Sequence, residues 1–272
     1  MKWGYDPQGG TPWNEIYQLK PGHFLYKGVE YPYWDWNSVP FTNLYDDLSL
    51  AVKLRLGGFR DAAVLLSGGL DSTIIYKLAL EQGLDITPIH VENNEHSYAE
   101  LLSDKLVYVN LDDVTDEDAV RIHQTPVDLG SVKPQIAMAR KLKELGFHNV
   151  LTGDGADELF GGYKRSSEYD SQMSDIFCEL PYYHLPKLDR TMMRSTVELR
   201  APFLAPSIIA HALNTPYHMR DGIKHVLKLA FKDLVPQEIL DRDKLPLKTK
   251  EIAKDKAKQR LINSQIWQEL YE

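Results

Sequence analysis

The sequence predicts an α/β domain built on a parallel sheet with flanking helices. Four short apolar runs, each next to a segment of helical pattern, carry this prediction; they are residues 62–66, 86–91, 106–111 and 149–151. Strands that alternate with helices form βαβ units, in which neighbouring strands run parallel. Glycine-rich loops follow the first and the last of these runs, and parallel strands bring such loops to one edge of a sheet.

The first part of the chain is different and predicts an aromatic appendage. Between residues 16 and 36, short β-prone stretches are broken by Pro21-Gly22 and Lys27-Gly28, which indicates a hairpin. We expect this hairpin to pack as a layer over the main domain, and a partner-binding surface is the alternative interpretation of its aromatic side chains. The expected division is therefore residues 1–44 as an appendage and residues 45–272 as the main domain.

Helical patterns fill much of the main domain. Residues 45–56 have an amphipathic pattern that is expected to end at Gly57. Strand signals fade after Tyr163, so the part from about residue 164 onward is expected to be mostly helical.

Composition narrows the class of protein. The formal net charge of −8 over 272 residues argues against a nucleic-acid partner, which usually meets a basic surface. Cys178 is the single cysteine, so an internal disulfide and a cysteine-rich zinc site are both excluded. Neither a signal peptide nor an apolar run of membrane-spanning length is evident, so we expect a cytoplasmic protein that does not bind a membrane.

A loop suited to phosphate follows the first apolar run. It reads SGGLDS and consists of Ser67, Gly68, Gly69, a leucine, Asp71 and Ser72, directly before a helical pattern. Glycines let an anion approach the backbone amides at a helix N-terminus, and the two serines add hydroxyl donors. A carboxylate beside a phosphate is explained by Mg²⁺ that bridges the two.

The alternative is purely structural: a glycine turn before a helix that Ser or Asp caps. The motif lacks the lysine of a Walker loop. It resembles instead the PP-loop of the ATP pyrophosphatase superfamily, which implies a Rossmann-like, five-stranded-type parallel sheet. Members of that superfamily cleave ATP between its α- and β-phosphates, adenylate a substrate and release pyrophosphate.

A second acidic, glycine-rich loop, TGDGADELFGGY, covers residues 152–163 and follows the last apolar run. Because the carboxyl ends of parallel strands share one edge, Asp154 and Asp157 are expected near the phosphate loop. The alternative is an acidic turn that caps a helix.

The two loops together resemble the synthetase domain of asparagine synthetase. Three later segments resemble that family in the same order, and so does the appendage, which is similar to the family's linker out of its glutaminase domain. The later segments are DRTMMRSTVELRAPFL from Asp189, IKHVLK from Ile223 and VPQEILDRDK from Val235.

The resemblance implies a set of site residues. The implied nucleotide-binding residues are Leu66, Ser67, Gly68, Gly69, Asp71, Ser72, Val91, Gly153, Asp154 and Lys224. Asp71 and Asp157 are implied as ligands of Mg²⁺. Asp154 and Lys224 are implied as catalytic, Asp154 at the adenylated intermediate and Lys224 at the charge on the phosphates.

The resemblance also implies a reaction. ATP adenylates a carboxylate, with that of aspartate as the first candidate, and an amine then displaces AMP.

The family's glutaminase domain begins with a catalytic cysteine, whereas this chain begins Met1-Lys2-Trp3. Ammonia, a separate ammonia-supplying subunit or another amine is therefore expected as the nitrogen source, and a homo-oligomer stays open. The short C-terminus after Lys244 suggests a reduced active-site lid, or one supplied by another chain.

Three alternatives stay open at this point. Relatives of this domain apply the same adenylation to other acid and amine pairs and form β-lactams or peptide bonds. Other PP-loop enzymes modify tRNA, but those are expected to carry catalytic cysteines or a basic RNA-binding surface. The third alternative is a nucleotide-binding partner subunit without catalysis. The sequence from His90, HVENNEH, contains H-x-E, yet no P-C-x-x-C completes a zinc deaminase signature. We expect this stretch to form a loop beside the adenine pocket instead, and an ordinary surface loop is the alternative.

Overall fold

The computed structural model of the chain describes residues 9–11, 13–34, 39–57, 61–91, 96–111, 113–124, 132–163, 173, 175–216, 219, 223–242 and 256–271. The strands are β1 (His23–Tyr26), β2 (Val29–Pro32), β3 (Asp61–Leu65), β4 (Asp85–Val91), β5 (Val107–Val109), β6 (Asn149–Leu151) and β7 (Glu198–Arg200). The helices before β6 are α1 (Leu44–Leu56), α2 (Leu70–Glu81), α3 (His96–Glu100), α4 (Asp116–His123) and α5 (Val132–Glu144). Those after β6 are α6 (Ala156–Phe160), η3 (Asp175–His184), α8 (Leu185–Arg194), η4 (Pro202–Leu204), α9 (Pro206–Asn214), α10 (His225–Ala230), α11 (Gln237–Leu240) and α12 (Lys256–Tyr271).

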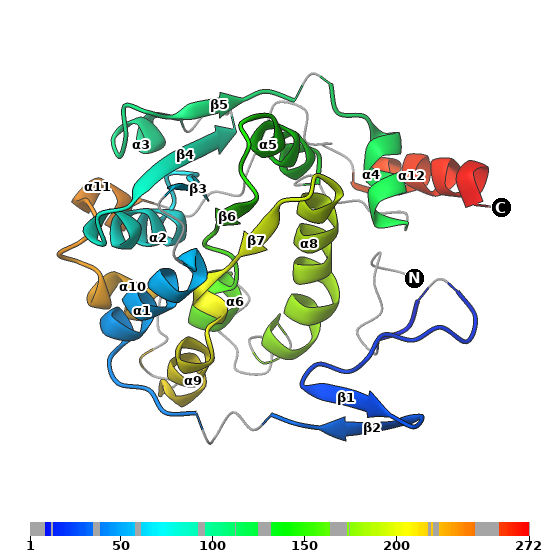
Figure 1. Cartoon of the computed structure of the whole chain (residues 1–272), viewed down its shortest axis with the longest axis horizontal. Coiled ribbons are helices and arrows are strands. Elements are labelled where there is room, and N and C mark those ends of the chain that lie inside the picture. Colours follow the sequence, from blue (N-terminus) through cyan, green and yellow to red (C-terminus); the bar gives the residue numbers. More distant parts are fainter. Residues whose placement is uncertain are drawn as a thin grey trace.

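Five parallel strands form the central sheet in the order β5-β4-β3-β6-β7, as Figure 1 shows. The predicted α/β class with a parallel five-stranded sheet is thus confirmed. From β3 the chain first builds outward to β4 and β5, and then returns to the other side of β3 as β6. The direction of winding therefore changes between β3 and β6, which is where ligands bind in open α/β sheets.

Helices cover both faces of the sheet and enclose two apolar cores. One core contains buried side chains of α1, α2, α9 and α10, and includes Leu48, Ile75 and Phe231. The other lies under α4, α5 and α8 and includes Ile136 and Met192. The central strands β3 and β6 are buried on both sides, as expected for a parallel sheet between two helical layers.

The predicted helix over residues 45–56 is α1, and it ends at Gly57 in the left-handed conformation, with φ of 56°. Strand β7 was missed, because only Leu199 among its three residues is apolar and the strand pairs with β6 alone. The part after Tyr163 is otherwise helical in the described residues, as predicted.

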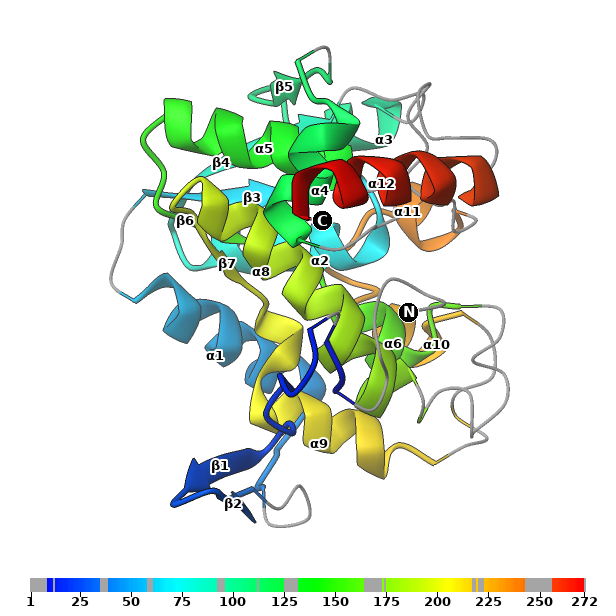
Figure 2. The ribbon, with the colours of Figure 1, turned by 90° about the vertical axis from the view of Figure 1, so that its right-hand side faces the viewer.

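The predicted hairpin is present as β1 and β2, which pair antiparallel. It lies at the margin of the molecule, away from the five-stranded sheet (Figures 1 and 2). Most of its side chains are exposed, among them Leu25, which is 61% exposed. The expectation that the hairpin packs as a layer over the main domain is therefore wrong.

The C-terminal helix α12 packs beside α4 (Figures 1 and 2). On its surface Trp267 contacts Trp13 of the N-terminal segment, with ring centroids 6.1 Å apart. No helix in the described ranges is long and apolar enough to cross a membrane.

Candidate active site

The phosphate loop connects β3 to α2. Gly69 takes the N-cap position of α2 in an extended conformation, so neither a serine nor the aspartate of the motif caps this helix. Ser67 and Ser72 contact each other instead, with their Oγ atoms 3.1 Å apart, and the Ser67 amide donates to the Ser72 Oγ at 3.2 Å. The alternative of a helix capped by Ser or Asp is therefore wrong, and the loop retains the backbone arrangement that suits an anion.

Gly68 fixes the back of this loop. Its φ of +73° lies in the left-handed region, and a Cβ added there would come within 2.8 Å of the Tyr98 Cβ. Its carbonyl accepts a hydrogen bond from Arg242 Nη1 at 2.7 Å, and the same guanidinium lies 4.5 Å from the centre of the Tyr98 ring. Arg242 and Tyr98 thus contact the phosphate loop at Gly68 and stabilise its conformation.

The second acidic loop lies directly against the phosphate loop. Val64 of β3 is paired with Leu151 of β6, so the two strands end side by side. A Cβ added at Gly153 would lie 2.7 Å from the Asp71 Cβ and 2.9 Å from the Ser72 amide nitrogen. Only glycine permits this approach, and the expectation that the two loops meet at one edge of the sheet is confirmed.

Lys224 joins the C-terminal helical part to both loops. Its Nζ forms ion pairs with Asp71 and with Asp157, and its side chain is only 6% exposed. Burial lowers the pKa of Lys224, but the charges of Asp71 and Asp157 outweigh burial and raise the pKa above its ordinary value. Lys224 is therefore a cation throughout the physiological range.

The backbone of Lys224 is strained. Its φ of 56° places a residue with a side chain in the left-handed region, at the N-cap of α10. That conformation costs about 1–2 kcal/mol, and such costs are concentrated at functional sites.

A cavity of 650 Å³ gathers the predicted residues. Of the predicted set, its lining includes Leu66, Ser67, Gly69, Asp71, Ser72, Val91, Gly153, Asp154, Asp157 and Lys224. Gly68 alone of that set does not line it, because this residue faces α3 and Arg242. The structure therefore brings together residues of β3, β4, the second loop and the C-terminal part.

Other residues of the lining were not predicted. They include Met138 of α5, His184 at the end of η3, Lys187 of α8 and Arg242. Gln135 of α5 also lines the cavity, and it is the last residue of the sequence DLGSVKPQ (residues 128–135), near which the family resemblance implies the pocket for the acid. Glu158 and Tyr163 also line the cavity and lie inside the second loop, of which only Gly153, Asp154 and Asp157 had been predicted as site residues. For Lys187 the only available signal was its place two residues before the DRTMM segment.

Asp154 and Glu158 differ in their surroundings. Asp154 accepts a hydrogen bond from the Thr152 hydroxyl. Glu158 is 4% exposed and accepts a hydrogen bond of 2.6 Å from the Tyr163 hydroxyl, with His184 Nε2 at 3.7 Å. Burial raises the pKa of Glu158, against the opposing effects of His184 and Tyr163. A buried carboxyl group with a raised pKa therefore lines this cavity.

His90 belongs to the wall of the cavity. It is 1% exposed, and its Nδ1 lies 2.7 Å from the Leu66 carbonyl oxygen, so Nδ1 carries the proton and donates it. This contact ties the end of β4 to the end of β3. Residues 92–95, which were expected to form a loop beside the adenine, lie outside the described residues.

Strand β7 anchors the start of the second loop. The Thr152 amide donates to the Arg200 carbonyl at 3.0 Å, and the Arg200 guanidinium contacts Glu198 at 2.8 Å and the Arg55 carbonyl.

A separate cavity of 930 Å³ opens beside these residues, between α1 and α8, and its lining includes none of the predicted site residues. The larger cavity is therefore not the candidate site.

The donor set also suits a magnesium nucleotide. Among the described residues, no three His, Cys, Asp or Glu side chains gather as an all-protein metal cage. Mg²⁺ usually takes only one or two carboxylates and completes its shell with water and phosphate oxygens. Asp71 and Asp157 both contact the Lys224 ammonium, so their carboxylates lie close enough together to reach one cation. Two carboxylates at this spacing fit the protein ligands that Mg²⁺ takes when it is bound with a nucleotide.

Comparison with known proteins points to one family. The family described as "Asparagine synthase" matches residues 43–177 and 169–267. Asparagine synthetase [glutamine-hydrolyzing] of Bos taurus is 27% identical over 267 residues, which cover 83% of this chain and 46% of that protein. A probable asparagine synthetase [glutamine-hydrolyzing] of Schizosaccharomyces pombe is 27% identical over 294 residues, which cover 85% and 53%.

Asparagine synthetase [glutamine-hydrolyzing] 1 of Lotus japonicus is 28% identical over 277 residues, covering 82% of this chain and 47% of that protein. The chain thus spans about half the length of the curated relatives that it matches. Because the family match extends over most of the sequence and includes both loops and Lys224, the chain belongs to the asparagine synthase family.

Proposed function

We propose that this protein is an ATP-dependent, amide-forming ligase that adenylates a substrate carboxylate, with L-aspartate as the first candidate. One observation carries the proposal: Lys224 is held between Asp71 and Asp157 where the phosphate loop meets the second acidic loop. A buried lysine that two carboxylates keep charged is suited to stabilise negative charge that develops on a leaving pyrophosphate. Family membership supports the same reaction class.

ATP is proposed to lie along the carboxyl edge of β3 and β4. Leu66 and Val91 offer apolar contact for the adenine, and both line the cavity. Ser67, Ser72 and the amides around Gly69 would hold the phosphates at the start of α2. Mg²⁺ bound with the nucleotide would be held by Asp71 and Asp157 and would neutralise phosphate charge.

In the first step an oxygen of the substrate carboxylate attacks the α-phosphorus of ATP. The bond from this phosphorus to the oxygen that bridges to the β-phosphate breaks, and that oxygen leaves as part of pyrophosphate. Lys224 stabilises the charge that develops there. The products of this step are an acyl-adenylate and pyrophosphate.

In the second step an amine attacks the activated carbonyl carbon. The bond from that carbon to the AMP oxygen breaks, AMP leaves, and the nitrogen gives up one proton. We assign the acceptance of this proton to Asp154, which lines the cavity beside the phosphate loop. Holding the adenylate and the amine in one cavity supplies a large part of the acceleration.

The nitrogen source and the domain division are part of the proposal. The relatives are named as glutamine-hydrolysing, and ammonia, a separate ammonia-supplying subunit or another amine is the proposed nitrogen source of this protein. Residues 45–272 are proposed as the synthetase domain and residues 1–44 as its appendage. A cytoplasmic location and a homo-oligomer remain predictions.

The test is pyrophosphate release from ATP and Mg²⁺ with L-aspartate, followed by product analysis with ammonium or glutamine. Release that requires aspartate, together with asparagine and AMP after addition of ammonium, supports the proposal. Release with a different acid would favour the alternative of another acid and amine pair. Nucleotide binding without pyrophosphate release for any acid would favour the alternative of a non-catalytic partner subunit.

A further inference from the structure

His184 is a titratable residue of the active-site cavity to which the proposed chemistry gives no role. It lies at the junction of η3 and α8 and lines the cavity together with Glu158. Helix α8 packs in the core under α4 and α5, whereas α2, which begins at the phosphate loop, belongs to the other core (Figure 1). His184 therefore approaches the cavity from the face of the sheet opposite to the helix that would hold the phosphates.

The imidazole of His184 lies between two carboxylates. Its Nε2 is 3.7 Å from Glu158 Oε1 and 3.7 Å from Glu179 Oε2, so it forms a hydrogen bond with neither. The Tyr183 ring packs edge-on against the imidazole, with ring centroids 4.9 Å apart, and the Tyr163 hydroxyl donates to Glu158 at 2.6 Å. Once Nε2 receives a proton, a carboxylate on either side can accept a hydrogen bond from it and stabilise the new charge.

The winding of η3 produces this arrangement. Glu179 and His184 are five residues apart, and an α-helix with 3.6 residues per turn would direct them to different sides. Residues Asp175–His184 form a π-helix instead, in which residues five apart lie one above the other. π-helical turns are rare and are frequently found at functional sites.

The charged groups that face His184 come from the second loop, η3 and α8. Asp154, Glu158 and Lys187 line the cavity with it, and the charges of both carboxylates act on Lys187. Glu179 lies outside the lining, and its side chain is 26% exposed. A proton that His184 takes up inside the cavity can therefore pass to Glu179 and from there to solvent.

The proposed second step needs a further base when the nitrogen source is ammonium. Ammonium has no lone pair and cannot attack a carbonyl carbon until it has lost a proton. After attack the nitrogen gives up another proton, which is the one assigned to Asp154. Amide formation from ammonium therefore releases two protons, and one of them has no acceptor among the residues assigned so far.

We infer that His184 is this further base and that ammonium is the nitrogen substrate which enters the cavity. An N–H bond of ammonium breaks, its electron pair stays on nitrogen, and the proton bonds to His184 Nε2 and passes on to Glu179. The ammonia so formed attacks the acyl-adenylate. His184 is then a catalytic residue and Glu179 a positioning residue. The inference rests on the proposed ligase activity.

A nucleophile that needs no base tests the inference. Hydroxylamine is a weaker base than ammonia and is mostly uncharged at neutral pH, so it can attack without first losing a proton to the enzyme. Both nucleophiles are offered with ATP, Mg²⁺ and L-aspartate, or another acid that supports exchange, to wild type, His184→Ala and Glu179→Gln. The control is His148→Gln, at an exposed position between α5 and β6. The readouts are kcat/KM for each nucleophile against pH, and acid-dependent exchange of pyrophosphate into ATP without a nucleophile.

We expect His184→Ala to lower kcat/KM for ammonium about 100-fold at neutral pH and to change hydroxylamine less than about threefold. Exchange should stay at the wild-type rate, and added imidazole should restore part of the ammonium-dependent rate. Glu179→Gln should lower kcat/KM for ammonium about fivefold and leave hydroxylamine unchanged. His148→Gln should alter none of these quantities.

The pH profile distinguishes ammonium from free ammonia. Because wild type takes the proton from ammonium itself, its kcat/KM for total ammonium should be nearly constant between neutral and mildly alkaline pH. His184→Ala must use ammonia that is already free, so its kcat/KM should rise about tenfold per pH unit over the same interval.

Equal losses for ammonium and hydroxylamine in His184→Ala would overturn the inference, because they would indicate a structural role. A wild-type profile that rises about tenfold per pH unit, or the absence of amide with ammonium, would also overturn it. If His184→Ala does not fold, the wild-type profile and Glu179→Gln decide, and an unchanged ammonium rate in Glu179→Gln would refute the proton path.

The exchange reaction separates this inference from the proposed function. Where acid-dependent exchange is present, any of these contrary results refutes only the assignment of His184 and retains the adenylating enzyme. Absence of exchange with every acid tested would refute the proposed ligase, and the inference with it.

Discussion

Lys224 and Asp71 form an ion pair although 153 residues separate them in the chain. The pair connects the C-terminal helical part to the loop after β3, and Asp157 adds a third charge from the loop after β6. Three distant segments therefore form one charged centre, and under the proposed function Lys224 of the C-terminal part acts on the phosphates at the phosphate loop.

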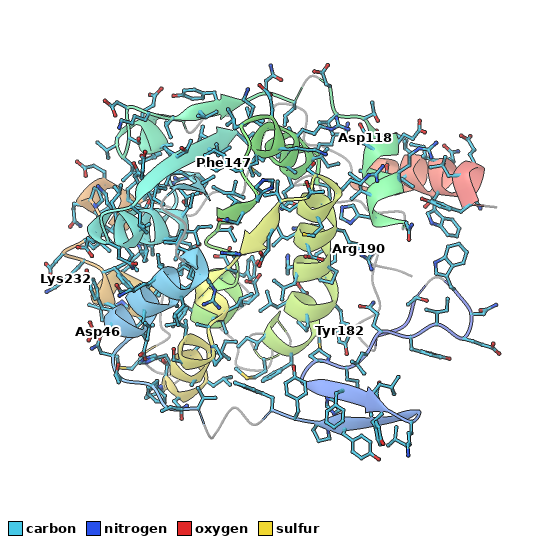
Figure 3. All side chains as sticks on the ribbon, viewed as in Figure 1. Asp46, Asp118, Phe147, Tyr182, Arg190 and Lys232 are labelled. Carbon is cyan, nitrogen blue, oxygen red and sulfur yellow. The ribbon has the colours of Figure 1, made fainter. Side chains whose placement is uncertain are left out.

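Lys224→Met is expected to reduce turnover about 100- to 1000-fold, because it removes a group that stabilises charge on the leaving pyrophosphate. The change also leaves two carboxylates facing each other, which should cost about 1–3 kcal/mol of unfolding free energy. Pyrophosphate release and urea unfolding measure the two effects. Lys232→Met, at the exposed surface labelled in Figure 3, is the matched control and should alter neither.

Gly153→Ala is expected to separate the two loops. The new Cβ would lie 2.7 Å from the Asp71 Cβ, so the backbone of one loop must move. We expect at least about a 100-fold loss of kcat/KM, since a displacement of this kind misplaces the reacting groups. Gly83→Ala serves as the control: its φ of +70° makes the change destabilising, but a Cβ there meets nothing within 4 Å, so activity should persist. Full activity in Gly153→Ala would contradict the close approach of the loops.

Arg242→Lys is expected to raise KM for ATP about tenfold, with a smaller change in kcat. Lysine keeps the charge but cannot both donate to the Gly68 carbonyl and stack on the Tyr98 ring as the guanidinium does. Tyr98→Leu should reproduce part of the effect. If KM for ATP stayed at its wild-type value in both variants, the proposed stabilisation of the phosphate loop by Arg242 and Tyr98 would be refuted.

His123 predicts a loss of stability in mild acid. It is 2% exposed, its Nε2 lies 3.2 Å from the Thr191 hydroxyl, and its carbonyl accepts a hydrogen bond from Arg190, which Figure 3 labels on α8. Burial, with smaller effects of Arg190 and Lys187, lowers the pKa of His123 from 6.5 to about 4.

Because the unfolded chain binds this proton more readily, the free energy of unfolding should fall between pH 6.5 and about 4, by up to about 1.4 kcal/mol per pH unit. The stabilising contribution is complete above pH 6.5. Urea unfolding at several pH values measures it, and His123→Gln should flatten the dependence over this interval. An unchanged slope in that variant would assign the acid sensitivity to other groups.

Much of the candidate site could be predicted because its signals are local. Asp71 and Asp157 lie in loops whose glycines and carboxylates follow apolar runs, and parallel strands bring such loops together whatever the rest of the chain does. Lys224 could be predicted only through the family resemblance. No local pattern indicates that a lysine near the start of α10 lies beside β3.

Other features depend on packing between distant elements. Lys187 and Gln135 enter the cavity because α5 and α8 pack together, which neither helix specifies alone. Strand β7 has a single apolar residue, so its pairing with β6 decides its conformation. The exposure of Leu25 and its neighbours in the hairpin is likewise set by what the rest of the fold leaves uncovered.

The most direct test of the account follows oxygen atoms through the reaction. Wild-type protein is incubated with ATP, Mg²⁺, ammonium and L-aspartate labelled with ¹⁸O in its carboxylates, and the nucleotide product is analysed by mass spectrometry. Attack of the carboxylate on the α-phosphorus predicts AMP that carries one ¹⁸O atom per turnover, together with unlabelled pyrophosphate. Formation of ADP with ¹⁸O in inorganic phosphate, or of AMP without label, would contradict adenylation of the acid.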